Sequence, residues 1–278
     1  MEIGLINKLK VNRGTDNGLY LIDDEENEVL LPNAYVTKDM KEGSEIEVFV
    51  YKDSEDRIVC TTQRPKMLLE QFALLEVKAV SQYGVFMDWG LPKDLMVPYA
   101  EQVREMHEGE KHVVFLTLDE ETERLIGSCK INDFLYFEDI KLEPGQEVDL
   151  MLFEVSDKGV YCIVDELYRG LIFHSDIHRK LRVGDQLKGF VKQIREDGKV
   201  DIVLDPIGYK ASVDPHSQII LDKLKEANGS LPFNDKSDPE IINQEFGISK
   251  KAFKRAIGNL YKQKLIRIEE EGVFLIKN

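Results

Sequence analysis

Three aromatic side chains stand at equivalent positions in three repeats of this sequence. Tyr20, Phe86 and Tyr161 each come two residues after a glycine, and basic residues recur toward the end of each repeat. These basic residues are Arg57, Arg124, Arg195 and Lys199. Exposed aromatic rings stack on unpaired bases, and Lys and Arg side chains contact the phosphates between those bases. The two sets predict a surface for single-stranded nucleic acid, while core or interdomain packing of the rings and simple solvation of the cations are the alternatives.

The elements that must position these residues follow from a spacing that occurs three times. A glycine is followed by a proline or a phenylalanine fourteen residues later and by another glycine twenty-five residues later. The three sets are Gly18, Pro32 and Gly43, then Gly84, Pro98 and Gly109, then Gly159, Phe173 and Gly184. Chance rarely keeps three landmarks in register, so the spacing predicts three copies of one small β domain.

Each copy contains five short strand-like runs with turn-rich pieces between them. The runs are 3–11, 19–22, 29–31, 45–51 and 57–62, then 74–80, 85–89, 95–97, 111–118 and 124–129, then 147–155, 160–164, 170–173, 186–194 and 200–204. Five antiparallel strands of this length predict a small closed barrel. Between the first two copies, residues 67–72 are predicted to form a helical connector, and Trp89 is predicted to be an interdomain wedge.

After residue 215 the period of the apolar pattern changes from two to 3.6. Ile219, Ile220 and Leu224 form one helical stripe. Further helices are predicted at 239–246, which opens with a proline and acids, and from 249 to about 264. Strand-like runs follow at 265–268 and 273–276, which makes a winged helix-turn-helix the natural interpretation.

The sequence therefore predicts a mainly β protein with an α+β C-terminal domain. The predicted domains are three barrels at 1–64, 71–131 and 145–206 and a winged helix at 215–278.

The charge of the chain is acidic but unevenly distributed. Its 278 residues carry a formal net charge of -15, which by itself disfavours a nucleic acid partner because phosphate binding draws on Lys and Arg. Residues 215–278 hold 11 Lys and Arg against 9 Asp and Glu, a net of +2, so residues 1–214 carry -17. An acidic body can still bind nucleic acid when its positive charge is gathered on one face.

Several function classes are disfavoured by what the sequence lacks. No apolar run approaches the ~20 residues of a membrane span, and no signal-peptide pattern opens the chain, which points to the cytoplasm. Cys60, Cys129 and Cys162 have no paired spacing and are expected to be buried thiols. No nucleophile–base pair, phosphate loop or metal-ligand spacing is present. The prediction is a binding protein without catalytic residues, metal, cofactor or small-molecule substrate.

The barrel copies resemble S1 domains, the RNA-binding oligonucleotide-binding (OB) barrels first described in a ribosomal protein. Residues 83–88, Tyr-Gly-Val-Phe-Met-Asp, resemble the S1 motif Phe-Gly-Ala-Phe-Val-Asp, and residues 170–177 resemble the Gly-Leu-Val-His-Ile-Ser motif that follows. Val183-Gly184-Asp185 resembles the opening of the fourth S1 strand. The resemblance implies three tandem S1-type OB-fold five-stranded barrels. It adds Tyr83 and His174 to the RNA-binding candidates, although His174 comes one position after the usual histidine.

The order of three such barrels and a winged helix resembles the bacterial conserved virulence factor B family. The Asp-Trp-Gly-Leu-Pro-Lys-Asp run at 88–94 and the Ser-Lys-Lys-Ala-Phe-Lys run at 249–254 add to this resemblance. It implies an RNA-binding protein that regulates gene expression after transcription. The last helix carries a positive group of residues, Lys250, Lys251, Lys254 and Arg255, which the resemblance marks as nucleic acid contacts.

Two other functions remain open at the level of the sequence. In the first, degenerate acidic barrels form a protein-interaction scaffold that docks on the ribosome or RNA polymerase. In the second, the winged helix is a DNA-binding regulator, a role that the acids Glu269, Glu270 and Glu271 in the wing disfavour. The sequence indicates neither the RNA target nor the oligomeric state.

Overall fold

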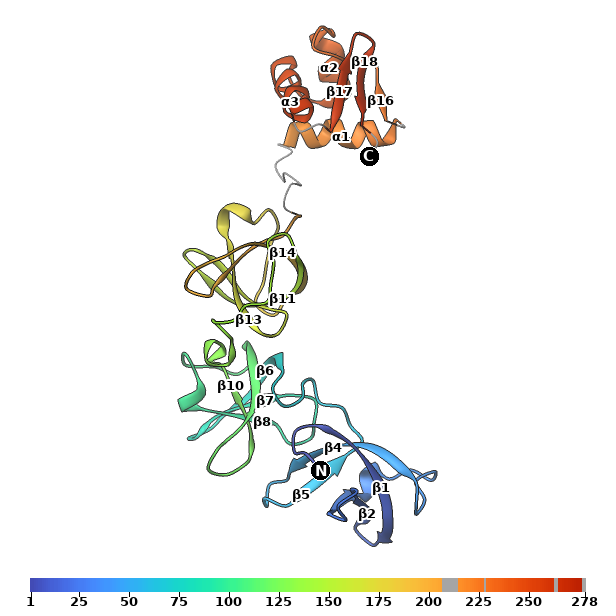
Figure 1. The fold of residues 1–278 in the computed structure, drawn as a ribbon, viewed down its shortest axis with the longest axis vertical. Coiled ribbons are helices and arrows are strands. Elements are labelled where there is room, and N and C mark those ends of the chain that lie inside the picture. Colours follow the sequence, from blue (N-terminus) through green and yellow to red (C-terminus); the bar gives the residue numbers. More distant parts are fainter. Residues whose placement is uncertain (207–214, 228, 263–264, 277–278) are drawn as a thin grey trace. The chain divides into compact units, whose positions relative to one another are not determined.

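The computed structural model describes residues 1–206, 215–227, 229–262 and 265–276, and the chain divides into two compact units (Figure 1). Met1–Leu204 contains three five-stranded β units in tandem. Asp205–Asn278 contains helices and a small sheet. The predicted fold class, a mainly β chain with an α+β C-terminal domain, is confirmed.

The first barrel is a closed sheet with the strand order β1-β2-β3-β5-β4. Its strands are β1 (Ile6–Thr15), β2 (Gly18–Ile22), β3 (Glu28–Pro32), β4 (Glu45–Lys52) and β5 (Ile58–Thr61). Every neighbouring pair is antiparallel except β3 and β5, which run parallel and close the barrel. A short 3-10 helix, Asn33–Tyr35, follows β3.

The third barrel repeats this closed topology. Its strands are β11 (Glu147–Ser156), β12 (Gly159–Val164), β13 (Tyr168–Phe173), β14 (Gln186–Ile194) and β15 (Val200–Val203). The order is β11-β12-β13-β15-β14, and the parallel pair β13 and β15 closes it. The short 3-10 helix is present here as His174–Asp176.

The second barrel has the same strand order without the closing ladder. Its strands are β6 (Phe72–Val80), β7 (Gly84–Asp88), β8 (Leu95–Pro98), β9 (Lys111–Leu118) and β10 (Leu125–Ser128), in the order β10-β9-β6-β7-β8. The open edges β8 and β10 still pack together. A Cβ at Gly127 in β10 would lie 2.8 Å from the side chain of Val97 and 3.2 Å from that of Leu95. The barrel is therefore nearly closed by side-chain packing.

The repeated spacing has a direct structural cause. Each first glycine pairs across a hairpin with the residue fourteen positions later, as Gly84 does with Pro98. A Cβ at Gly84, where φ is 154°, would lie 2.2 Å from the carbonyl oxygen of Val97, so no larger residue fits. Each second glycine turns the chain into the fourth strand and donates its N–H to the first strand, as Gly109 does to the Val77 carbonyl at 2.9 Å.

The first two barrels share one hydrophobic core. Trp89, which is 3% exposed, packs edge-on against Phe49 of the first barrel with ring centroids 5.6 Å apart. Its Nε1 donates to the carbonyl of Lys93 at 2.5 Å. The interdomain wedge predicted at Trp89 is confirmed.

The helical connector predicted at 67–72 is wrong. The backbone N–H of Leu69 donates to the Gly4 carbonyl and that of Glu70 to the Leu116 carbonyl, both at 2.9 Å. Because the backbone N–H groups of the connector donate to the two barrels beside it, they are not available for the hydrogen bonds of a helix. Phe72 at its end already belongs to β6.

The second and third barrels meet through a separate aromatic cluster. Its buried members include Phe72 and Phe115 of the second barrel and Ile163 of the third. Phe115 lies between two further rings, with centroids 4.7 Å from Phe72 and 4.0 Å from Phe134. The three barrels are therefore joined by buried apolar contacts at both junctions.

The C-terminal unit is a winged helix. It contains α1 (Pro215–Glu226), β16 (Ser230–Leu231), α2 (Pro239–Phe246), α3 (Lys250–Lys262), β17 (Ile266–Glu269) and β18 (Gly272–Leu275). The sheet order is β16-β18-β17. The Asp238 side chain caps α2 by accepting from the Glu240 N–H at 2.8 Å, and Gly247, with φ of 66°, ends that helix.

The apolar stripe of α1 differs from the sequence prediction at one position. Ile220 and Leu224 are fully buried as expected, but Ile219 is 36% exposed and Leu221, at 9%, takes the buried place. The difference reflects the 100° turn per residue of a helix, which puts Ile219 at the edge of the face that packs on α3.

The three cysteines are buried and free, as predicted. Burial raises the pKa of the Cys60 thiol and of the Cys129 thiol to about 12. None of the helices in the described residues has the length and apolar character needed to cross a membrane.

Candidate nucleic-acid interface

The third barrel carries an aromatic platform on its strand surface. Tyr161 of β12 is half-buried and lies nearly parallel to Phe153 of β11, with an interplanar angle of 28° and ring centroids 6.2 Å apart. The guanidinium of Arg169 in β13 lies 4.3 Å from the centre of the Tyr161 ring. We call Phe153, Tyr161 and Arg169 the platform.

Arg169 makes no ion pair with any residue that the structure describes, and its Nε is buried without a hydrogen-bond partner. A guanidinium stacked on a ring keeps its in-plane N–H groups available for a phosphate or a base edge. The chain has 52 acidic and 37 basic residues, so an arginine without an acidic partner distinguishes this face of the third barrel.

The other candidates of the third barrel lie around a second ring, Phe173. Arg195 is 5.4 Å from the centre of the Phe173 ring and pairs at 2.6 Å with the buried carboxylate of Asp201. That carboxylate raises the pKa of Arg195. Lys199 pairs with Asp197 at 2.6 Å. Both predicted cations are therefore neutralised locally.

His174 occupies the start of the short 3-10 helix rather than a strand face. It is exposed, and its Nε2 lies 2.9 Å from the carbonyl oxygen of Ser156.

The first barrel also stacks an arginine on its tyrosine, but this arginine comes from the first strand of the barrel and is paired with an acid. Arg13 of β1 lies 4.1 Å from the centre of the Tyr20 ring, and Tyr20 is its cross-strand partner. Glu28 holds Arg13 through contacts of 2.8 and 3.2 Å. Arg57, the predicted phosphate contact of this barrel, is exposed and pairs with Asp53 at 2.8 Å and Glu55 at 3.0 Å.

The second barrel brings three predicted residues together. Tyr83, Phe86 and Arg124 line one groove of about 300 Å³, together with Tyr51 and Lys52 from the first barrel. Tyr83 is 66% exposed, and Phe86 is half-buried with no cation stacked on its ring in the described residues. The groove combines aromatic rings with basic side chains, as a single-strand site requires.

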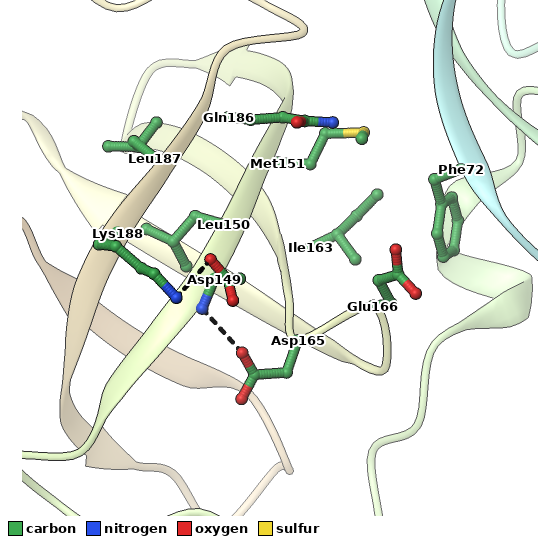
Figure 2. A pocket seen from close by; sticks show the side chains of 10 residues that line it. All are labelled: Phe72, Asp149, Leu150, Met151, Ile163, Asp165, Glu166, Gln186, Leu187 and Lys188. Atoms are coloured by element: carbon green, nitrogen blue, oxygen red, sulfur yellow. Dashed lines mark hydrogen bonds and ion pairs between the residues drawn. The ribbon is translucent and has the colours of Figure 1, made fainter. Parts of the chain in front are cut away.

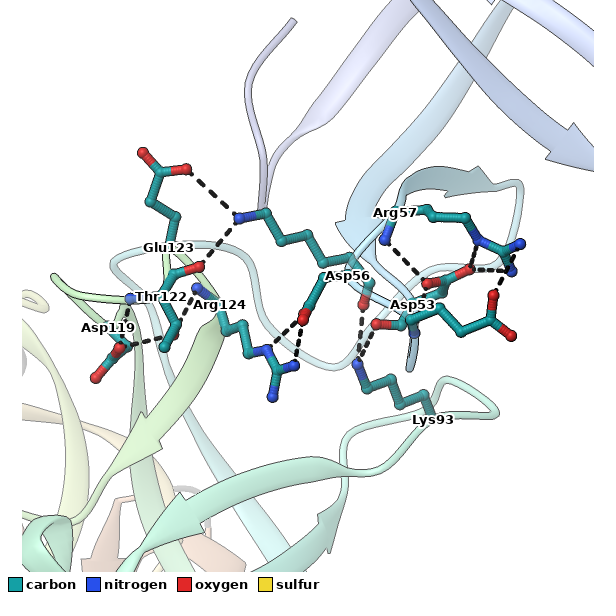
Figure 3. Close-up of polar contacts among 10 residues, drawn as sticks. Asp53, Asp56, Arg57, Lys93, Asp119, Thr122, Glu123 and Arg124 are labelled. Atoms are coloured by element: carbon teal, nitrogen blue, oxygen red, sulfur yellow. Dashed lines mark hydrogen bonds and ion pairs between the residues drawn. The ribbon is translucent and has the colours of Figure 1, made fainter.

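Arg124 also ties the second barrel to the first (Figure 3). Its Nε and Nη2 donate to the two carboxylate oxygens of Asp56 at 2.6 and 2.5 Å. This bidentate contact holds the pKa of Asp56 below its usual range. Two lysines complete the junction: Lys52 donates to the Thr122 carbonyl at 3.1 Å, and Lys93 donates to the carbonyls of Lys52 and Asp53. The predicted phosphate contact at Arg124 is thus engaged in an interbarrel bridge.

A larger groove between the second and third barrels has the wrong charge for nucleic acid (Figure 2). It has a volume of about 560 Å³, and its lining includes Phe72, Asp149, Asp165 and Glu166. Lys188 also lines it but pairs with Asp149 at 2.7 Å. We call this the acidic groove, and phosphates would be repelled from it.

The winged helix keeps its candidate cations on the exposed side of α3. Phe253, Ala256, Ile257 and Leu260 face the core, while Lys251, Lys254 and Arg255 are exposed and Lys250 is half-buried. Lys254 pairs loosely with Asp235 at 3.5 Å. Lys250, Lys251 and Arg255 have no ion-pair partner in the described part of the chain. This face of α3 is therefore electrostatically available.

Sequence reasoning missed Arg13, Phe153 and Arg169. A signal existed for the two arginines. Each follows from strand pairing, because Arg13 is the cross-strand partner of Tyr20 and Arg169 lies diagonally across from Tyr161, two residues before its partner Leu171. Phe153 could not be found in this way, because it is the extra residue of a β-bulge between Leu152 and Glu154.

Three tandem five-stranded OB-type barrels followed by a winged helix define a class of multidomain nucleic-acid-binding proteins. The S1 domain model matches residues 3–63, and the CvfB-like winged helix domain model matches residues 218–275. The chain is 32% identical over 265 residues to uncharacterized protein YitL of Bacillus subtilis, across 91% of this chain and 87% of that protein. The chain belongs to the conserved virulence factor B family.

Other relatives span nearly the whole chain. Conserved virulence factor B of Staphylococcus aureus is 28% identical over 286 residues, across 99% of this chain and 94% of that protein. A crystal structure described as a multidomain protein with nucleic acid binding domains, from Streptococcus pneumoniae TIGR4, is 24% identical. It covers 99% of this chain and 98% of that chain, with a TM-score of 0.47.

Proposed function

We propose that this protein binds single-stranded RNA in the cytoplasm and regulates gene expression after transcription. It acts as a binding protein without catalysis. The strand surfaces of the barrels hold the bases, and the exposed side of α3 adds phosphate contacts. The S1 and winged-helix domains support a nucleic acid ligand, and two of the relatives are named conserved virulence factor B.

The observation that carries this proposal is the platform of the third barrel. Tyr161 offers a ring for stacking, and Arg169 beside it has no acid to neutralise it in the described residues. Stacking on an aromatic side chain contributes about 1 to 3 kcal/mol per base and is independent of base identity. A single strand is favoured over a duplex because exposed aromatic rings stack on unpaired bases, which a duplex does not present.

Titration of labelled single-stranded RNA, single-stranded DNA and duplex DNA of equal length with the intact chain tests the proposal. Fluorescence anisotropy at two salt concentrations should show micromolar or tighter RNA binding that weakens with salt and exceeds duplex binding. Preference for the duplex would favour the winged helix as a DNA reader, and no binding to any of the three would refute the proposal.

The alternative of a protein-interaction scaffold is favoured by one set of contacts. Arg57 and Arg124, the predicted phosphate contacts of the first two barrels, are both held by carboxylates. A scaffold that docks on the ribosome or RNA polymerase would use these barrels as a rigid acidic body and would bind isolated RNA weakly.

A further inference from the structure

A second groove lies at the junction of the second and third barrels, and its charge is opposite to that of the acidic groove. It has a volume of about 520 Å³. Arg104, Lys111 and His112 line it from the second barrel, and Phe153, Glu154 and Val155 line it from the third. We call it the basic groove. Its position at a junction sets it apart from the strand face that any one barrel presents.

The cations of the basic groove are accessible. The side chains of Arg104 and Lys111 are each 60% exposed. Lys111 is only loosely paired, with its Nζ 3.8 Å from Glu76, and Arg104 lies 3.3 Å from Glu110. His112 Nε2 contacts the same Glu110 at 2.9 Å. Glu154 is the one acid in the lining itself, so the lining residues carry a formal charge of +1 with His112 neutral, and Glu110 and Glu76 lie beside the cations outside the lining.

The acidic groove provides the contrast within the same pair of barrels (Figure 2). Asp149, Asp165 and Glu166 line it, and its single lysine, Lys188, is bound to Asp149 at 2.7 Å. The two grooves therefore differ in the sign of their charge while sharing a junction, and a polyanion would enter only the basic one.

Phe153 connects the basic groove to the platform. As the bulge residue of β11, it both lines the groove and stacks beside Tyr161. A β-bulge redirects a side chain away from the regular alternation of a strand. The corresponding bulges hold Asn12 in the first barrel and Lys78 in the second, so only the third barrel has a ring at this point.

We propose that the basic groove binds the next nucleotide of an RNA strand whose preceding base stacks on Tyr161. The base packs against Phe153 and the exposed Val155, and the phosphate is held by Lys111 and Arg104. Asn132 also lines the groove, and its buried Oδ1 accepts no hydrogen bond in the described chain. This inference rests on the proposed function and extends it from one barrel to a path across two.

Charge reversal at one lysine in each groove tests the inference. Lys111→Glu and Lys188→Glu are matched, because the two lysine side chains are 60% and 57% exposed and each pairs with an acid on a neighbouring strand. Anisotropy with the full chain and a labelled single-stranded RNA should show roughly five- to tenfold weaker binding for Lys111→Glu, with a salt slope lower by about one. Lys188→Glu should stay within about twofold of the unmodified chain. Melting temperatures and the milder Lys111→Ala variant distinguish lost contact from lost fold.

Each outcome decides a different claim. A loss of RNA affinity for Lys111→Glu but not for Lys188→Glu supports RNA binding in the basic groove. The inference that RNA binds in the basic groove is overturned if the two lysine variants lose RNA affinity equally. It is also overturned if Lys111→Glu binds RNA as well as the unmodified chain does. In both cases the proposed function stands. If the unmodified chain binds no RNA, the proposed function fails and the groove inference fails with it.

Discussion

The first and third barrels each place an arginine over an equivalent tyrosine at nearly the same distance, but from different neighbouring strands, β1 for Arg13 and β13 for Arg169. The guanidinium-to-ring distance is 4.1 Å for Arg13 and Tyr20 and 4.3 Å for Arg169 and Tyr161. The difference lies in a third residue. Glu28 binds Arg13 with two hydrogen bonds, whereas Arg169 has no acidic partner in the described residues.

A repeat can therefore keep a ring with a stacked arginine and still differ in whether that arginine is free to bind an anion. An arginine held by a carboxylate has its donors occupied and its charge cancelled, so an incoming phosphate must displace the acid. We therefore propose that RNA binds chiefly to the third barrel and that the first barrel has a structural role.

The largest expected effect comes from removing the ring of the third barrel. Tyr161→Ala should weaken RNA binding by about 1 to 3 kcal/mol, the value of one stacked base, while Tyr20→Ala should leave it nearly unchanged. Anisotropy titration measures both, and Tyr161→Phe, which keeps the ring, is the control. Equal losses of RNA affinity at Tyr20 and Tyr161 would show that the first and third barrels bind RNA alike.

Removing the stacked arginine should have a smaller effect. Arg169→Ala loses one cation, so RNA affinity should fall by about 1 kcal/mol and the salt slope by about one. Arg13→Ala should change neither quantity, because Glu28 already neutralises that arginine. The measurement is the dissociation constant over a series of salt concentrations, and an Arg13→Ala variant with the larger slope change would contradict the assignment.

Removing the carboxylate that binds Arg13 in the first barrel should modestly raise the affinity for RNA. Glu28→Gln keeps the shape of the side chain and removes the charge that holds Arg13, which makes the first barrel electrostatically similar to the third. RNA affinity should rise by about twofold, with a steeper salt dependence. Unchanged affinity and slope in a stably folded variant would show that more than Glu28 separates the two barrels.

The barrel interiors should show no such difference. Burial raises the pKa of Cys60 in the first barrel to about 12 and also raises that of Cys162 in the third. Since the thiolate is the reactive form and a raised pKa keeps the thiol protonated at pH 8, both should react slowly with iodoacetamide in the native protein. Mass spectrometry of the labelled chain checks this, and rapid labelling of one barrel alone would indicate a loose core there.

The fold could be predicted from the sequence because the repeated glycine spacing has a steric cause. Gly18, Gly84 and Gly159 each face a backbone carbonyl across a hairpin that a Cβ would strike. Because of this constraint, the same glycine spacing is found in the sequence of all three repeats. The connector at 67–72 was not accessible, because its backbone bonds to residues distant in sequence, Gly4 and Leu116.

The site was only partly accessible, for an electrostatic reason. The pattern located the rings Tyr20, Phe86 and Tyr161 correctly on equivalent strands, but it could not indicate which cations meet an acid. Arg124 pairs with Asp56 from another barrel, a contact that no local spacing reveals. Whether these residues bind RNA stays a prediction.

Photocrosslinking tests whether RNA binds chiefly to the third barrel. A single-stranded RNA carrying 4-thiouridine is irradiated with the full chain, and the crosslinked peptides are identified by mass spectrometry. The account predicts adducts in the third barrel at Phe153, Tyr161 or Arg169, with few in the first barrel around Tyr20. Adducts concentrated around Tyr20 and Arg57, with none in the third barrel, would contradict it.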